Sequence, residues 1–244
     1  NMLVRTKAIV LHTLKYSESS LIAQCYTQVV GKQSFILKGV LTAKKGTIRK
    51  SQFQALTQLE ILFDHKNNGK LQFLKEVKVI SPYQTIPNKI EKNALVQFLA
   101  ETLKNAIQEE GETNPALYLF LETAFNWLDS NDNISDFHLV FLINLTKYLG
   151  FFPNEEPMDA LYFNLETGCF ELSMPREQHI KGSQVPVFRE LLGMNFGASI
   201  KLRLNRAKRR ELLETLIRYF ELHLLGFSKP KSLQILNEIF DDVS

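Results

Sequence analysis

Residues 55–79, ALTQLEILFDHKNNGKLQFLKEVKV, decide the fold of the first third of the chain. Leu59, Ile61 and Phe63 alternate with polar or outward residues, which is the period of a β-strand with one buried face. Asn67-Asn68-Gly69 predicts a hairpin turn, because Asn and Gly adopt positive φ at low cost. The strand that returns over 70–79 is predicted to bury the alternate apolar residues Leu71, Phe73, Val77 and Val79.

The same strand pattern precedes this hairpin. Residues 3–14, 21–27 and 33–40 are rich in Val, Ile and other apolar residues and are separated by short turns. Five strands within residues 1–80 favour a small closed barrel, because closure removes the exposed strand edges.

The hydrophobic period changes to that of helices after residues 81–87, which we expect to be a linker. Residues 88–244 then form the second predicted domain, which is helical except for an irregular insert at about 151–180. Within the insert, residues 161–172 predict a β-hairpin that turns at Gly168. The fold class is therefore α+β, a five-stranded barrel followed by an all-helical domain with a small hairpin insert. The expected helices cover about residues 95–107, 117–128, 137–149, 185–192, 206–225 and 232–240.

Charge is distributed unevenly along the 244 residues. Residues 1–80 carry 13 basic and 4 acidic side chains, a net charge of +9, and the remainder carries −6, which leaves +3 overall. Such asymmetry indicates a part that binds a polyanion. Basic side chains on a barrel neutralise phosphates and release counterions, while exposed aromatic rings stack on bases. We expect Tyr16, Tyr26, Phe35 and Phe53 either to stack on bases or to fill the core. The predicted phosphate-binding residues are Lys7, Lys15, Lys32, Lys38, Lys44, Lys45, Arg49 and Lys50.

A second basic cluster precedes and begins the helix at 206–225. Positive charge at a helix N-terminus is unfavourable against the helix dipole, so these residues are expected to have another use. They either bind an anionic partner or are neutralised by Glu101, Glu109, Glu110 and Glu112. The cluster comprises Arg203, Arg206, Lys208, Arg209 and Arg210.

Signals of catalysis and metal binding are weak. The five histidines are scattered without metal-ligand spacing, and no nucleophile, phosphate-loop or dinucleotide motif occurs. Cys25 and Cys169 are far apart. We therefore expect a protein that is not an enzyme, with no cofactor and no metal.

The segments TKAIVL at 6–11, YSESSLI at 16–22 and GKQSFILKGV at 31–40 resemble the opening of the bacterial DNA repair and recombination protein RecO family. The resemblance implies an OB-fold N-terminal domain, an all-helical C-terminal domain and no catalytic site. It implies binding of single- and double-stranded DNA, annealing of complementary strands and help in loading recombinase. The implied protein partners are the acidic, Phe-ended tail of single-stranded DNA-binding protein, RecR and RecF.

One departure from that family concerns the insert. Many members carry a four-cysteine zinc site there, whereas this chain has only Cys169. One thiolate cannot form a tetrahedral zinc site, so we expect the insert to be held by packing of Tyr162, Phe163 and Phe170.

Two other functions are compatible with a basic barrel. An RNA-binding OB-fold factor would use the same phosphate and stacking contacts, and a protein-interaction adaptor would present its basic face to an acidic protein. Because no apolar signal segment precedes Arg5 and Lys7 and cysteines are few, we expect a cytoplasmic, nucleoid-associated protein.

Overall fold

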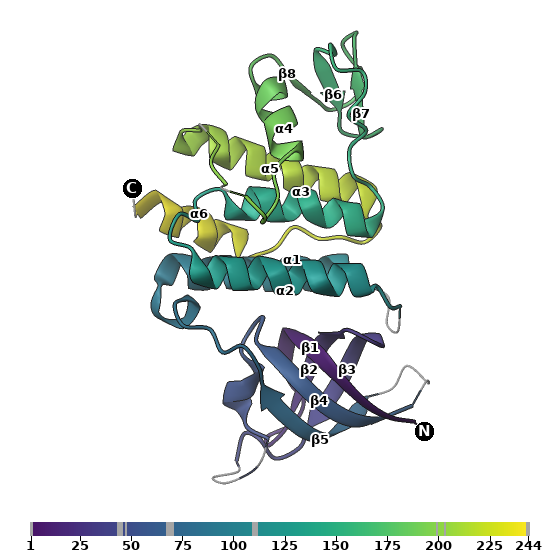
Figure 1. The fold of residues 1–244 in the computed structure, drawn as a ribbon, viewed down its shortest axis with the longest axis vertical. Coiled ribbons are helices and arrows are strands. Elements are labelled where there is room, and N and C mark those ends of the chain that lie inside the picture. Colours follow the sequence, from purple (N-terminus) through teal and green to yellow (C-terminus); the bar gives the residue numbers. More distant parts are fainter. Residues whose placement is uncertain are drawn as a thin grey trace. The chain divides into compact units, whose positions relative to one another are not determined.

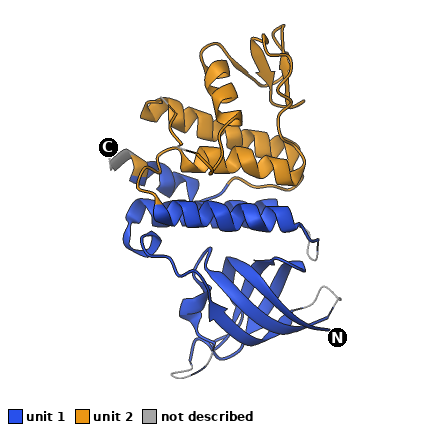
Figure 2. Ribbon diagram, viewed as in Figure 1, with its two compact units in different colours: residues 1–130, 230–239 blue, residues 131–229, 240–244 orange. Residues whose placement is uncertain are grey.

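The computed structural model describes residues 2–42, 46, 48–66, 71–108, 112–198, 200–202 and 204–242. The predicted turn at 67–69 lies outside these residues. Two compact units make up the chain (Figure 2): residues 1–130 with 230–239, and residues 131–229 with 240–244. This grouping differs from the predicted domains, because the first two helices belong to the same unit as the barrel.

Five strands of the first unit close into a barrel in the order β1-β2-β3-β5-β4 (Figure 1). Four of the pairings are antiparallel, and the parallel pairing of β3 with β5 closes the barrel. β1 is long enough to pair with β4 through its first half and with β2 through its second half. The strands are β1 (Met2–Lys15), β2 (Leu21–Thr27), β3 (Gly31–Leu37), β4 (Gln58–His65) and β5 (Gln72–Val79), and the short 3-10 helix η1 (Lys50–Phe53) precedes β4.

The apolar face of the barrel strands forms a dense core. Phe35 and Phe63 meet edge to face with ring centroids 4.9 Å apart, and Cys25 lies among them fully buried. The predicted inward face of β4, Leu59, Ile61 and Phe63, is confirmed.

The prediction that Leu71 and Phe73 share the buried face of Val77 and Val79 is wrong for the first half of β5. Leu74 and Glu76 pair with the consecutive residues Phe63 and Leu62, so Lys75 is an extra residue, a β-bulge. Before the bulge the inward residues are Gln72 and Leu74, and after it they are Val77 and Val79. Phe73, predicted to be buried, therefore points outward and is 48% exposed.

Two helices complete the first unit together with part of a third: α1 (Ile90–Ala106), α2 (Pro115–Ser130) and the first residues of α6 (Leu233–Asp242). Asn114 caps α2 as its sequence suggests, because its side chain accepts a hydrogen bond from the Leu117 N–H at 2.9 Å.

The segment expected to be a linker is held by hydrogen bonds within the first unit. The Asp129 carboxylate accepts the backbone N–H groups of Gln84, Thr85 and Ile86 at 2.8–3.1 Å, and η2 (Ile86–Asn88) follows. Burial raises the pKa of Asp129, but these hydrogen bonds outweigh it and leave the pKa below its usual value.

The second unit contains α3 (Phe137–Leu149), α4 (Gln184–Leu192), α5 (Arg206–His223), the end of α6 and a small sheet. The predicted hairpin is present as β6 (Tyr162–Asn164) and β7 (Cys169–Glu171), but β8 (His179–Lys181) pairs with the other edge of β6. The insert is thus a three-stranded sheet rather than a two-stranded hairpin.

Aromatic packing holds the insert. Phe163 lies 4.8 Å from Phe170 and 4.6 Å from Phe188, measured between ring centroids, and the guanidinium of Arg189 lies 3.6 Å above the Phe170 ring. Phe163 and Phe170 are buried, whereas Tyr162 is only half-buried. None of the helices within the described ranges has the length and apolar character needed to cross a membrane.

Gly31, the first residue of the motif segment at 31–40, provides a test of backbone packing. It has φ +64°, and a Cβ atom there would overlap the backbone carbonyl of Glu112. We expect Gly31→Ala to lower the free energy of unfolding in urea by about 3 kcal/mol or more, from strain plus overlap. Gly39→Ala is the control: its φ is +72° but nothing lies within 4 Å, so only about 1–2 kcal/mol is expected. Equal losses would contradict the close approach.

His138 of α3 provides a pH-dependent test. It is 3% exposed, its Nδ1 has no hydrogen-bond partner among the residues that the structure describes, and burial together with the charge of Arg209 lowers its pKa to about 3. The unfolded state binds a proton below about pH 6.5 that the folded state does not, so stability is lost as the pH falls. Between pH 7 and pH 5 this group should cost about 2 kcal/mol of unfolding free energy.

The matched variant is His138→Phe, which keeps an aromatic ring beside Phe240. Its loss of unfolding free energy between pH 7 and pH 5 should be smaller than that of the unmodified chain by that amount. Parallel pH profiles would show that His138 is not held neutral.

Candidate nucleic-acid interface

Several cations of the barrel have partners inside the first unit. Arg5 pairs with Glu60 at 3.2 Å and with Glu76 at 2.8 Å, and Lys75 pairs with Asp64 at 2.7 Å. Three of the four acidic residues of 1–80 are thus engaged with neighbouring cations. The positive excess of this region is therefore concentrated elsewhere on the barrel.

Two predicted phosphate-binding residues have structural contacts instead. Lys32 is 7% exposed, and its ammonium donates to the Ile107 carbonyl at 2.8 Å, so it is not available to a strand. Lys7 pairs with Glu122 of α2 at 2.8 Å. Sequence alone could not show this, because both partners lie at least 75 residues away.

An outward-facing apolar row crosses four strands of the barrel. Leu14 pairs with Ile22, Ile22 with Ile36, and Ile36 with Phe73, so the four side chains share one face of neighbouring strands. Lys38 lies over the Phe73 ring with its Nζ 4.8 Å from the centroid. We call these five residues the barrel platform; it combines exposed apolar surface with a cation.

The turn that follows Lys15 and the segment that follows Lys38 meet at one end of the barrel. The turn after β1 is closed by Tyr16 N–H donating to the Ser20 carbonyl at 3.0 Å. Ser20 Oγ accepts the Gly39 N–H at 3.3 Å, and the Leu41 N–H donates to the Ser19 carbonyl at 3.0 Å. These contacts join the motif segments at 16–22 and 31–40, because the turn at Ser19-Ser20 and the segment after Lys38 hold each other in place.

The remaining predicted cations differ in position. Lys15 is exposed beside this turn, and Arg49 and Lys50 are exposed at η1. Lys44 and Lys45 lie outside the described residues.

The aromatic candidates separate clearly into core and surface. Tyr26, Phe35 and Phe53 are buried, whereas Tyr16 is 56% exposed. Phe73, which the strand pattern placed in the core, is the ring on the barrel platform. The bulge at Lys75 changes the phase of the strand, and no local signal in the sequence marks it.

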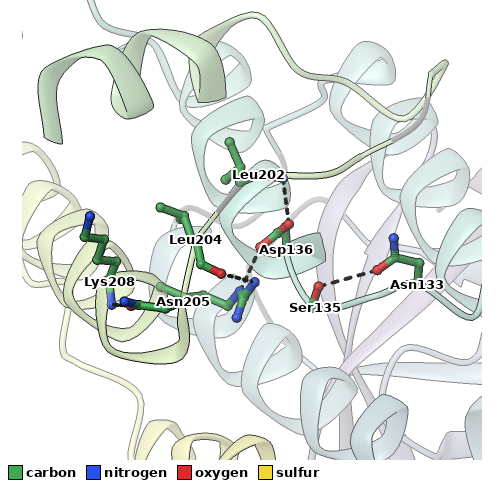
Figure 3. A network of polar contacts seen from close by, with 8 residues as sticks. Asn133, Ser135, Asp136, Leu202, Leu204, Asn205 and Lys208 are labelled. Carbon is green, nitrogen blue, oxygen red and sulfur yellow. Dashed lines mark hydrogen bonds and ion pairs between the residues drawn. The ribbon is translucent and has the colours of Figure 1, made fainter. Parts of the chain in front are cut away.

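The second basic cluster contains an internal ion pair (Figure 3). Arg209 Nε lies 2.7 Å from Asp136 Oδ1, and the other Asp136 oxygen accepts the Leu202 N–H at 2.8 Å. Asp136 is 2% exposed, so Arg209 neutralises a buried carboxylate of the same unit. Its guanidinium is therefore already engaged and is a poor candidate for binding an anionic partner. None of the four predicted acidic partners is involved in this pair.

The other members of the cluster are placed differently. The Lys208 N–H donates to the Asn205 side chain at 2.9 Å and so completes the cap of α5, while the Lys208 side chain is exposed (Figure 3). Arg206 and Arg210 are exposed on the same helix. Arg203 lies outside the described residues.

The residues of the insert do not fit a four-cysteine zinc site. Cys169 supplies one sulfur, and among the described residues no group of three or more His, Cys, Asp or Glu side chains could hold a metal. Cys25 is in the barrel core, where burial raises the pKa of its thiol to about 12. No step of any mechanism is therefore assigned to a metal.

Comparison with known proteins agrees with this architecture. The family models for the recombination protein O N terminal and C terminal match residues 2–83 and 87–234. The chain belongs to the RecO family. Proteins named DNA repair protein RecO share 46% identity with it in Christiangramia forsetii, 43% in Flavobacterium johnsoniae and 36% in Bacteroides fragilis. Each match covers 98% of this chain and 100% of the relative.

The resemblance drawn from the motif segments at 6–40 is confirmed by these matches. RecO membership also agrees with the observed order of a five-stranded N-terminal barrel followed by helices.

Arg209→Ala tests the structural role of the ion pair in this RecO-family chain. Removing the guanidinium leaves a buried carboxylate without its partner, which we expect to lower the free energy of unfolding by about 3–5 kcal/mol. Lys208→Ala, at the preceding exposed position, should change it by about 0.5 kcal/mol or less. A small effect of Arg209→Ala on the urea unfolding free energy would contradict this structural role, and Arg209 would again be a candidate for binding an anionic partner.

Proposed function

We propose that this RecO-family chain is a DNA-binding protein of recombinational repair, whose barrel is an OB-fold that holds single strands. The barrel platform supports the proposal most directly, because Phe73 is an exposed ring that carries a cation, Lys38. Stacking of bases on such rings and contact of phosphates with neighbouring cations are sequence-tolerant interactions. The relatives named DNA repair protein RecO supply the repair context.

The platform has the features that a strand requires. Leu14 and Phe73 expose apolar surface at its two ends, and Lys38 and Lys15 lie at the end of the barrel where the turn after β1 meets the segment after β3. A strand laid across the row would place its bases on the apolar surface and its phosphates near these lysines.

Annealing follows from such binding without covalent chemistry. Each lysine that meets a phosphate releases condensed counterions, and two strands held on one basic surface repel each other less. We propose no catalytic step; the chain would bring complementary strands together and help load recombinase on single-stranded DNA in the nucleoid.

We propose that the protein partners are those of the family: single-stranded DNA-binding protein, RecR and RecF. A mainly apolar groove in the second unit supports single-stranded DNA-binding protein as a partner, because it is lined by Ile180, Val187 and Leu212 and also by the oppositely charged Lys208 and Glu211. The apolar walls match a terminal phenylalanine, and Lys208 is the cation that would meet an acidic group of the peptide.

The platform is tested by anisotropy titrations of a labelled single-stranded oligonucleotide at several salt concentrations. Phe73→Ala should weaken binding about 5- to 100-fold, because a stacked base contributes about 1–3 kcal/mol. Lys38→Ala should reduce the slope of log K against log salt by about 0.7.

Lys75→Ala is the matched control, because Lys75 lies on the same strand but pairs with Asp64. It should change affinity by less than about twofold. Unchanged affinity and slope in both platform variants would refute the assignment. A strong preference for a matched RNA strand would instead support the RNA-binding alternative.

A further inference from the structure

A pocket in the first unit lies apart from the barrel platform. It has a volume of about 430 Å³ and is bounded by the middle of β1, η1 and α1. Val10, Leu21 and Phe53 form a buried apolar wall, which Ala100 of α1 extends. The size and the mixed lining are those of a site for a small organic ligand.

Three cationic or titratable side chains from three different elements converge on this pocket. They are His12 of β1, Lys50 of η1 and Lys104 of α1. Within the described part of the chain, neither Lys50 nor Lys104 forms a salt bridge. Positive groups that arrive from separate elements without an ion-pair partner favour an anionic ligand.

The carboxylate that lines the pocket is already engaged. Glu101 accepts the backbone N–H groups of Lys231 and Ser232 at 2.9 Å and the Ser232 hydroxyl at 2.5 Å. Burial raises the pKa of Glu101, but these hydrogen bonds and the charge of Lys104 outweigh it, so the pKa lies below its usual value. Glu101 therefore anchors the start of α6, and much of its accepting capacity is already used.

The pKa of His12 responds to the charges that line the pocket. Burial lowers its pKa, the charge of Lys104 lowers it further, and Glu101 opposes both. Two amides, Gln54 and Gln97, complete the lining, and each can both donate and accept a hydrogen bond. Amide side chains of this kind match the edges of nucleobases.

We propose that this pocket binds a nucleoside monophosphate unit, with its phosphate between Lys50, Lys104 and His12 and its base against the apolar wall. The phosphate supplies about two negative charges at neutral pH, which Lys50 and Lys104 offset, while the neutral His12 ring can donate a hydrogen bond to a phosphate oxygen. A free nucleotide and the phosphorylated end of a strand share this chemistry. Phe73 and Lys38 are not part of the lining, so the inference does not depend on the platform.

Calorimetric titration with deoxyadenosine 5′-monophosphate tests the site in the full chain. Saturable binding is expected, weakened about tenfold or more by Lys104→Ala and equally by removal of the phosphate from the ligand. Lys78→Ala, at an exposed barrel lysine outside the pocket, should leave binding unchanged. The His12 ring resonances should shift on binding, and Lys104→Gln serves as a second variant if Lys104→Ala unfolds.

Two oligonucleotides, one with a 5′-phosphate and one with a 5′-hydroxyl, distinguish a free nucleotide from the phosphorylated end of a strand as the ligand. A preference for a 5′-phosphorylated over a 5′-hydroxyl oligonucleotide that persists in Phe73→Ala but is lost in Lys104→Ala assigns the strand end. Binding of the mononucleotide without that preference assigns the free nucleotide, and either result supports the proposal. The proposal fails if the mononucleotide does not saturate the chain, if Lys104→Ala and Lys104→Gln bind it normally, or if inorganic phosphate binds as tightly.

Discussion

The parallel contact between β3 and β5 is the constraint on which the N-terminal unit depends. It joins only two residue pairs, Phe35 with Gln72 and Ile36 with Phe73, yet it closes the barrel. Because strand side chains alternate, this register places Phe35 and Gln72 inside and Ile36 and Phe73 outside. The same contact thus completes the core and creates the exposed row that we propose as the strand-binding surface.

The bulge at Lys75 makes that register compatible with the rest of β5. Without an extra residue, a strand that buries Val77 and Val79 against β4 would also bury Phe73. The bulge changes the phase of alternation between the two halves of β5. Val77 and Val79 therefore pack against the core, while Phe73 in the first half points outward. Bulges are common where a barrel must turn a side chain toward a functional surface.

One carboxylate in each unit, the half-buried Asp129 and the buried Asp136, organises a connection between elements. Asp129 collects three backbone N–H groups from the segment before α1, and Asp136 holds both Arg209 and the Leu202 N–H. In each case a short acidic side chain satisfies backbone donors outside regular secondary structure, and at Asp136 the Leu202 N–H that it accepts is buried. This is why part of the charge of the chain is structural, and why counting charges along the sequence overestimates the surface available to a polyanion.

Local patterns in the sequence determined much of the architecture. Alternation identified the strands, helical periodicity identified most helices, Asn114 and Asn205 identified two helix caps, and the segments at 6–40 identified the RecO family. These features depend on neighbouring residues, so they can be recognised without the fold. The tertiary structure alone decided which charges and rings are exposed. Lys7, Lys32 and Arg209 meet partners far away in the chain, and a bulge turns Phe73 outward, because such contacts depend on distances that close only on folding.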